Sequence, residues 1–240
     1  MSIITPRYFM IGAAFVVFLL LSNIVAGKLV TFGGVVLPAA VVLFPVTYIF
    51  GDILTEVYGF KGSRLVIWTG LLANVFMAAV FLLVLALPYP GFWLHQDAYA
   101  QVLGITPKVV FASVLGYFCG EFCNSVTLSA LKKATKGKHL WFRTISSTVV
   151  GEGVDTLIFI SIVFAGAVAA HVLYQMILAQ YLFKVAYEVL ATPLTYAAAG
   201  WLKKREKLDV YDYGVVYNPF GLDLKYSDEN LMLKNVMLKP

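Results

Sequence analysis

Apolar residues occur along this chain in long runs, which short clusters of polar and charged residues interrupt. Six of the runs are long enough to cross a bilayer, which takes about 20 residues of helix. We expect these spans at residues 8–27, 35–54, 64–87, 109–131, 145–169 and 173–200. The pattern therefore predicts an all-α integral membrane protein with six transmembrane helices.

The composition supports the same class. Of the 240 residues, 60% are hydrophobic and 13% are charged, whereas a soluble domain carries about 25% charged residues. The mean hydropathy is +0.84. A net charge of +5 would also suit a nucleic-acid-binding protein, but the basic residues lie in short clusters between apolar runs. That distribution orients a membrane protein and predicts no nucleic-acid partner.

The basic clusters predict the orientation of the spans. With six spans, both ends of the chain fall on one side of the membrane. That side would hold Arg7, Lys61, Arg64, Lys132, Lys133, Lys136, Lys138, Arg143, Lys203, Lys204, Arg205 and Lys207, and the other only Lys28 and Lys108. Because Lys and Arg are enriched in cytoplasmic loops, we expect a bacterial inner-membrane protein with both termini in the cytoplasm. Residues 1–205 would form the membrane domain and residues 206–240 a short cytoplasmic tail.

Two acidic residues lie at the end of the second span. Asp52 and Glu56 are four residues apart, so on a continuous helix they share a face. A carboxylate inside hydrocarbon is costly, and such residues usually face the interior of a bundle or a water-filled cavity. The alternative is that the helix has ended and Asp52 lies in interfacial water.

The fifth span repeats this feature. The polar and small residues on one of its helix faces are Thr148, Gly151, Glu152 and Asp155. This face can only point inward, although packing of small residues around one structural acid is an alternative. Further polar candidates in the other spans are Asn23, Glu121, Asn124, Tyr181, Lys184 and Glu188. We expect Lys184 to pair with Glu188 on its own helix or with an acid of another helix.

Two weaker patterns concern symmetry and assembly. Gly51-Asp52-Ile53-Leu54 in the second span resembles Gly153-Val154-Asp155-Thr156-Leu157 in the fifth. If the chain holds two three-helix repeats, they are inverted, because each has an odd number of crossings. In inverted-repeat transporters the binding site lies near the midplane at the repeat interface. Gly116 and Gly120 form a Gly-x-x-x-Gly pair, which favours helix packing and permits a homodimer.

The chemistry of these residues favours an organic ligand over a metal. The three histidines lie near span ends or in loops, Cys119 and Cys123 form no zinc or disulfide pattern, and the chain has no P-loop. We therefore expect no metal and no cofactor. A carboxylate can accept two parallel N–H bonds from a guanine-type base, and an aromatic ring such as Tyr48 can stack on its face.

Several short motifs follow one another along the chain: Ser22-Asn23, Phe44-Pro45, Asp52, Thr55, Gly59, Arg64, Ser147-Thr148, Gly151, Asp155-Thr156, Tyr181, Phe183-Lys184, Pro193, Tyr211-Asp212-Tyr213-Gly214 and Asn218-Pro219-Phe220. In these residues the chain resembles the queuosine precursor transporter family, a family of vitamin uptake transporters of the VUT type. The resemblance covers nearly the whole chain. It implies import of a small deazapurine base for tRNA queuosine modification, namely 7-cyano-7-deazaguanine, 7-aminomethyl-7-deazaguanine or queuine, and no enzyme activity.

We therefore predict a transporter whose Asp155, with Glu152 beside it, receives the donor edge of the base, and whose Asp52 forms the second half of the site. Asn23, Asn124, Tyr181 and Lys184 complete the predicted binding residues. The residues with a predicted coupling or ion-pair role are Glu56, Glu121, Glu188 and Lys184. Three alternatives stay open: a substrate-binding subunit of an energy-coupling-factor vitamin transporter, an intramembrane acid hydrolase using Asp52 and Asp155, and a proton or small-ion pathway.

Overall fold

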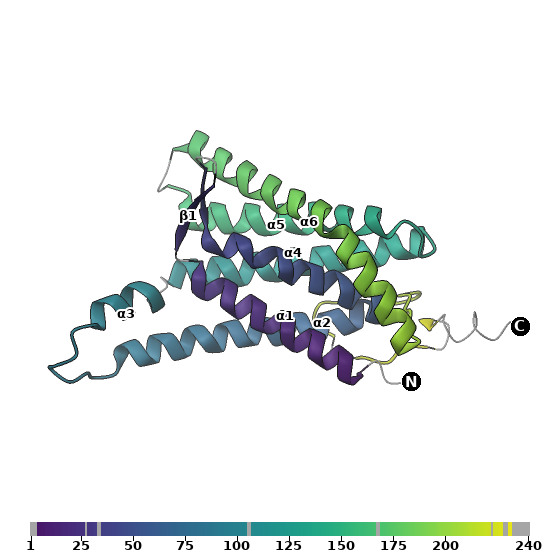
Figure 1. The fold of residues 1–240 in the computed structure, drawn as a ribbon, viewed down its shortest axis with the longest axis horizontal. Coiled ribbons are helices and arrows are strands. Elements are labelled where there is room, and N and C mark those ends of the chain that lie inside the picture. Colours follow the sequence, from purple (N-terminus) through teal and green to yellow (C-terminus); the bar gives the residue numbers. More distant parts are fainter. Residues whose placement is uncertain are drawn as a thin grey trace, which may run out of the picture.

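The computed structural model describes residues 4–26, 28–32, 35–104, 107–166, 169–221, 223–227 and 230–231. Its helices are α1 (Pro6–Val25), α2 (Phe44–Ala86), α3 (Gln96–Leu103), α4 (Pro107–Ala134), α5 (Leu140–Phe164) and α6 (Ala170–Glu206). An antiparallel hairpin, β1 (Leu29–Phe32) and β2 (Val35–Pro38), and a 3-10 turn, η1 (Ala39–Val42), connect α1 to α2. The predicted helical class is confirmed, with one small hairpin added (Figure 1).

α2 consists of two helical halves that meet at a sharp reversal. Gly59 has φ 75° and ψ 176°, a backbone conformation that glycine adopts at no steric cost. Before this break, Tyr58 packs against Tyr8, with ring centroids 4.9 Å apart, and Phe50 packs against Phe18 further along. Residues 44–58 therefore run antiparallel to α1.

The second half of α2 returns beside α1 in the same direction as α1. The Tyr8 hydroxyl donates to Gly62 O at 2.8 Å, and Asn23 Nδ2 donates to Asn74 Oδ1 at 2.7 Å. Residues 44–58 and 60–86 thus take the places of the predicted spans 35–54 and 64–87. The predicted start of the second span is wrong, because residues 35–42 form a strand and a 3-10 turn. A short apolar run does not by itself distinguish strand from helix.

The contact between α4 and α5 is the most extensive between any two elements, and α6 packs on the other helix of this pair, α5. Glycines allow the close approach of α4 and α5. A Cβ atom added at Gly120 would lie 2.7 Å from the Asp155 Cβ, and one at Gly151 would lie 2.7 Å from the Asn124 Cβ. Gly116 also faces Asp155. The Gly-x-x-x-Gly pair is therefore used inside the chain, and the inference of a homodimer from it loses its support.

This bundle is apolar on its surface and carries charged residues in its interior, the reverse of a soluble protein. Large apolar side chains point outward, and Phe9, Phe76 and Leu190 are 71%, 71% and 81% exposed. In the interior, by contrast, several acidic and basic side chains are fully buried. Three described helices are long and apolar enough to cross a membrane: Pro6–Val25, Val46–Ala86 and Leu140–Phe164. This distribution is typical of a multi-pass membrane protein.

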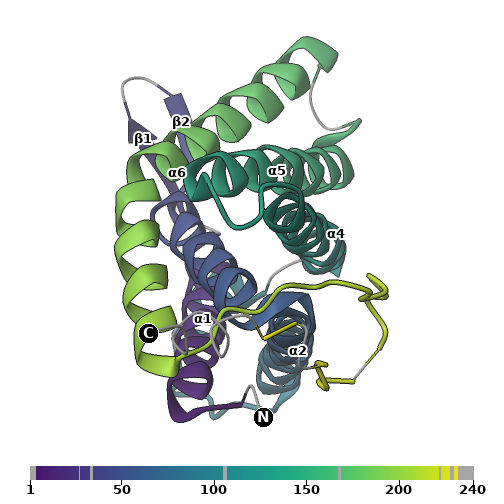
Figure 2. The ribbon, with the colours of Figure 1, turned by 90° about the vertical axis from the view of Figure 1, so that its right-hand side faces the viewer.

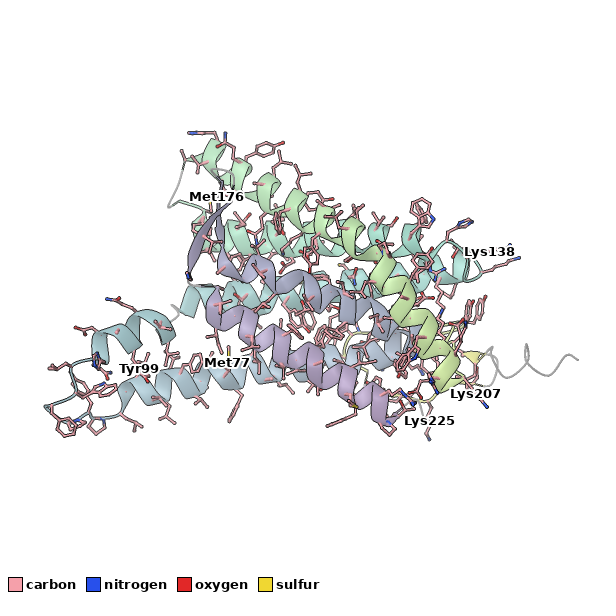
Figure 3. All side chains as sticks on the ribbon, in the orientation of Figure 1. Met77, Tyr99, Lys138, Met176, Lys207 and Lys225 are labelled. Carbon is pink, nitrogen blue, oxygen red and sulfur yellow. The ribbon has the colours of Figure 1, made fainter. Side chains whose placement is uncertain are left out.

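The beginning of α1 and the end of α6 lie at the same end of the bundle. Arg7 Nη1 is 3.2 Å from Glu206 Oε1. Lys138, Lys207 and Lys225 lie at this end too, while α3 and the hairpin lie towards the other (Figure 3). We call it the basic end.

Beyond α6 the chain crosses the basic end of the bundle, next to the break in α2 (Figure 2). Here it covers the last carbonyl groups of the first half of α2, which have no partner within that helix. Val210 N donates to Val57 O at 3.2 Å, and Lys132 Nζ of α4 donates to Glu56 O at 2.5 Å. The tail therefore packs against the bundle.

The same tail covers the first N–H groups of the second half of α2. The Asp212 carboxylate accepts from Phe60 N at 3.0 and 3.2 Å, and the Tyr226 hydroxyl accepts from Lys61 N at 2.9 Å. A carboxylate at this place acts as an N-cap and also complements the helix dipole. The tail thus provides hydrogen-bond partners for the backbone groups on both sides of the helix break, which would otherwise be buried without partners.

Candidate functional site

A lysine pairs with two acids in the interior of the bundle. Lys184 Nζ of α6 lies 2.5 Å from Glu152 Oε2 and 2.7 Å from Asp155 Oδ2, both on α5. The Lys184 and Glu152 side chains are 3% and 1% exposed. Positions 152 and 155 are three residues apart, so α5 presents both acids on one face. Charges this deeply buried are tolerated only when they are paired.

Asp52 lies in the first half of α2, where Asn124 of α4 holds it. Asn124 Nδ2 donates to Asp52 Oδ1 at 2.8 Å, and both residues are 0% exposed. Within the described residues, Asp52 Oδ2 and Asn124 Oδ1 have no hydrogen-bond partner. The alternative that the helix ends before Asp52 is wrong, because α2 continues and the residue is buried. Two unsatisfied acceptors thus lie on neighbouring side chains.

Two further buried acids interact with Asp52. Glu121 of α4 is 0% exposed, and neither of its carboxyl oxygens has a hydrogen-bond partner in the part of the chain that the structure describes. Glu188 of α6 is 2% exposed, and its Oε1 is likewise unsatisfied there. Both interact electrostatically with Asp52. Acids of α4 and α6 thus lie near Asp52, and the acids of α5 interact with Tyr48, which is on the same helix as Asp52. We call these five acids the central acidic cluster: Asp52, Glu121, Glu152, Asp155 and Glu188.

Tyr48 lies beside the central acidic cluster, although the sequence analysis names it only as a ring that could stack on a base. It is 2% exposed and lies one helical turn before Asp52. Lys184 Nζ is 6.0 Å from the centroid of its ring, and Tyr48 interacts electrostatically with Glu152, Asp155 and Glu121. The four-residue spacing from Asp52 is the signal that would have found it.

Glu56 lies apart from this centre, in an ion network at the basic end. Its Oε1 is 2.6 Å from Arg143 Nη2, 2.5 Å from Lys203 Nζ and 3.8 Å from Lys132 Nζ. Lys132 and Lys203 also pair with Asp209 of the tail, at 2.5 and 3.0 Å. The network thereby connects the ends of α2, α4, α5 and α6 to the tail, and its geometry is that of a structural ion network.

Two of the predicted binding residues lie at helix contacts. Asn23 bonds to Asn74 between α1 and the second half of α2. Tyr181 is half-buried, and its ring lies beside Gly153, where an added Cβ would be 3.6 Å from Tyr181 Cε2. The structure therefore joins Tyr181 to the α5–α6 contact that holds Lys184. The roles of Asn23 and Tyr181 in binding stay predictions.

The central acidic cluster has the chemistry of a hydrogen-bond acceptor site. No group of three or more His, Cys, Asp or Glu side chains in the described ranges is arranged to hold a metal ion. The unsatisfied acceptors Asp52 Oδ2, Asn124 Oδ1 and Glu188 Oε1 instead complement a ligand that presents N–H donors, because a buried acceptor without a donor is costly. A multi-pass membrane protein with such a centre fits the class of small-solute transporters.

Comparison with known proteins agrees with this class. A family model described as "Putative vitamin uptake transporter" matches residues 38–198, and the chain belongs to that family of transporters. It is 26% identical over 187 residues to the "Probable queuosine precursor transporter" of Bacillus subtilis (strain 168), an alignment that covers 78% of this chain and 82% of the relative. No solved structure gives a significant match. The family resemblance that the sequence motifs indicate is confirmed.

Proposed function

We propose that this transporter imports a queuosine precursor, a deazapurine base with a guanine-type edge, through six membrane crossings. The observation that carries the proposal is a pair of buried acceptors without a partner, Asp52 Oδ2 and Asn124 Oδ1, on two side chains that bond to each other. A guanine-type base presents neighbouring ring N–H and amino donors on one edge, so acceptors on two neighbouring side chains suit it. The printed name of the Bacillus subtilis relative supports the same class of cargo.

The contacts of Lys184 change the assignment of the acids from the one that the sequence suggests. Lys184 already bonds to Asp155 and Glu152, whereas Asp52 and Asn124 each keep an unsatisfied acceptor and also bond to each other. We therefore assign the donor edge of the base to Asp52 and Asn124. Asp155 and Glu152, held by Lys184, would form the other side of the site, and Tyr48 would stack on the base.

We also propose that both termini lie in the cytoplasm and that the chain resides in the inner membrane. The basic end carries the beginning of α1, the end of α6 and the labelled lysines of Figure 3. Cytoplasmic segments of membrane proteins are enriched in Lys and Arg. Reporter fusions after residues 104 and 137, which lie at opposite ends of α4, should report opposite sides of the membrane. Signals from the same side would refute this topology.

Binding by purified protein tests the cargo and the site together. Thermal unfolding in detergent is measured with 7-cyano-7-deazaguanine, guanine or riboflavin. We expect saturable stabilisation by the deazaguanine, no stabilisation by riboflavin, and loss of the effect in Asp52→Asn. Asp97→Asn, at an exposed acid of α3, is the matched control. Equal stabilisation of Asp52→Asn and wild type would refute the assigned contact, and no response to any queuosine precursor would refute the cargo.

Uptake by cells gives the second measure. Asp155→Asn should abolish uptake at a normal membrane level of the protein, because Lys184 then faces one acid instead of two. Unchanged uptake would show that Asp155 is not part of the site.

A further inference from the structure

Within the ranges that the structure describes, no hydrogen-bond donor or cation pairs with the carboxyl group of Glu121. The side chain is 0% exposed, and both oxygens lack a hydrogen-bond partner among the residues that the structure describes. The carboxyl group lies directly against Gly51 of α2, where an added Cβ would overlap Glu121 Oε1. The same added atom would lie 3.6 Å from the ring of Phe15. The Glu121 carboxyl group and the Phe15 ring thus both lie beside Gly51.

In the described part of the chain, the groups that interact with Glu121 are phenols and acids, and they supply no positive charge. Tyr48 of α2 and Tyr117 of α4 are neutral phenols, and both are buried. Asp52 of α2 and Glu152 and Asp155 of α5 are acids that interact with it electrostatically. Lys184 of α6 lies at the two acids of α5, and Glu188 of α6 adds another acid near Asp52.

The charge balance of the central acidic cluster points the same way. Its five acids would carry five negative charges if all were ionised, while Lys184 is the cation that bonds inside it. An ionised carboxylate that is desolvated and unpaired costs far more than its neutral form, so such a group takes up a proton. Asp52 at least accepts from Asn124, and the acids of α5 have Lys184. Neither oxygen of Glu121 has such a partner among the described residues, whereas one oxygen of Glu188 is unsatisfied there, so Glu121 is the acid of the cluster with the least compensation for a negative charge.

We propose that Glu121 is a proton-binding site that couples import of the base to proton entry, an inference that rests on the proposed transport function. One proton from the external water binds the Glu121 carboxylate while the site is open to that side. The neutral carboxyl group can then be buried against Gly51 as the site closes. When the site opens to the cytoplasm, water reaches the group, and the O–H bond breaks to release the proton. One proton thereby crosses with each base, and the carboxylate is restored.

Transport by purified protein in sealed vesicles tests the coupling. Labelled 7-cyano-7-deazaguanine uptake is followed with a proton gradient, with a sodium gradient, and with a protonophore. Wild type and Asp97→Asn should accumulate the base with the proton gradient and lose accumulation with the protonophore. Glu121→Gln, which mimics the neutral acid, should only equilibrate the base, at a rate that the gradient does not change. Proton-driven accumulation by Glu121→Gln, or accumulation driven by sodium alone, would overturn the proposal.

Infrared spectroscopy detects the protonated carboxyl group directly, in protein without bound base. The infrared spectrum of wild-type protein at neutral pH should contain the C=O band of a protonated carboxylic acid. Glu121→Asp should shift the band and Glu121→Gln should remove it. If the band is absent from wild type, the proton-binding site is wrong whatever the uptake data show. If wild type imports no base, the proposed function fails and the coupling with it. If wild type imports base without any response to a proton gradient, the coupling alone is wrong.

Discussion

The tail of this protein makes a strong prediction, because a single carboxylate supports the helix break in α2. Asp212 is 2% exposed and accepts hydrogen bonds from Phe60 N, from the Ser129 hydroxyl of α4 and from the Tyr226 hydroxyl at 2.7 Å. Asp212→Asn replaces one acceptor oxygen with a donor and removes the charge from the other. It therefore weakens every one of these contacts and leaves at least one donor without a partner.

The size of the effect follows from these contacts. A hydrogen bond to a charged group contributes about 1.5–3 kcal/mol, and loss of an N-cap side chain costs about 0.5–2 kcal/mol. The contacts of Asp212 share one carboxylate, so their losses do not simply add. We expect Asp212→Asn to reduce the free energy of unfolding by about 2–4 kcal/mol.

The two free cysteines provide the assay. Cys119 and Cys123 are partly buried in α4, so a thiol-reactive dye reports unfolding of purified protein on heating. Asp212→Asn should unfold at a lower temperature than wild type. Asp223→Asn is the control, because Asp223 is 60% exposed and its contacts with Lys61 and Lys225 N are exposed to solvent; it should unfold like wild type. An unchanged midpoint for Asp212→Asn would refute the view that the tail stabilises the helix break.

Three further predictions use the same assay. Gly59→Ala should reduce the free energy of unfolding by about 1–3 kcal/mol through its backbone conformation alone, and further because the added Cβ would lie 2.5 Å from Tyr226 Oη. The loss should exceed that of Gly214→Ala, whose added Cβ meets no atom within 4 Å. Equal losses would contradict this. Lys184→Met should lose about 3–5 kcal/mol, because it leaves two buried acids unpaired, and a wild-type midpoint would show that they are not ionised. Burial and Asp212 raise the pKa of Tyr226, so its contribution is present below the ordinary tyrosine pKa of about 10 and is lost as the pH rises above it. The midpoint of Tyr226→Phe should therefore fall less at alkaline pH than that of wild type, and parallel pH profiles would exclude the effect.

The sequence by itself determined the class of this protein and the faces of its helices. Long apolar runs have to be buried in lipid, and the charged residues inside them have to face inward, whatever the order of the helices. The polar face of α5 is buried for this reason, with Thr148 and Glu152 each 1% exposed. Helical spacing was sufficient for that result.

Only the tertiary structure decided which acid meets which partner. Asp52 and Glu56 share a helix face, yet Asp52 meets the amide of Asn124 and Glu56 meets three cations at the basic end. Spacing along one helix gives the direction of a side chain, but the partner comes from another helix, and many arrangements satisfy the same periodicity. Lys184 likewise had acids on several helices available, and the packing of α5 on α6 selected Glu152 and Asp155.

The break at Gly59 shows the same division most clearly. The apolar pattern indicates two crossings there, and glycine permits the reversal, but the sequence does not show that one residue is enough for the turn. A reversal this tight leaves backbone groups at both helix ends without partners. Residues from the tail, Val210 and Asp212 among them, satisfy these groups, and Asp212 lies 152 positions after its partner Phe60. Contacts between segments so distant in sequence leave no local pattern, and for that reason only the folded chain reveals them.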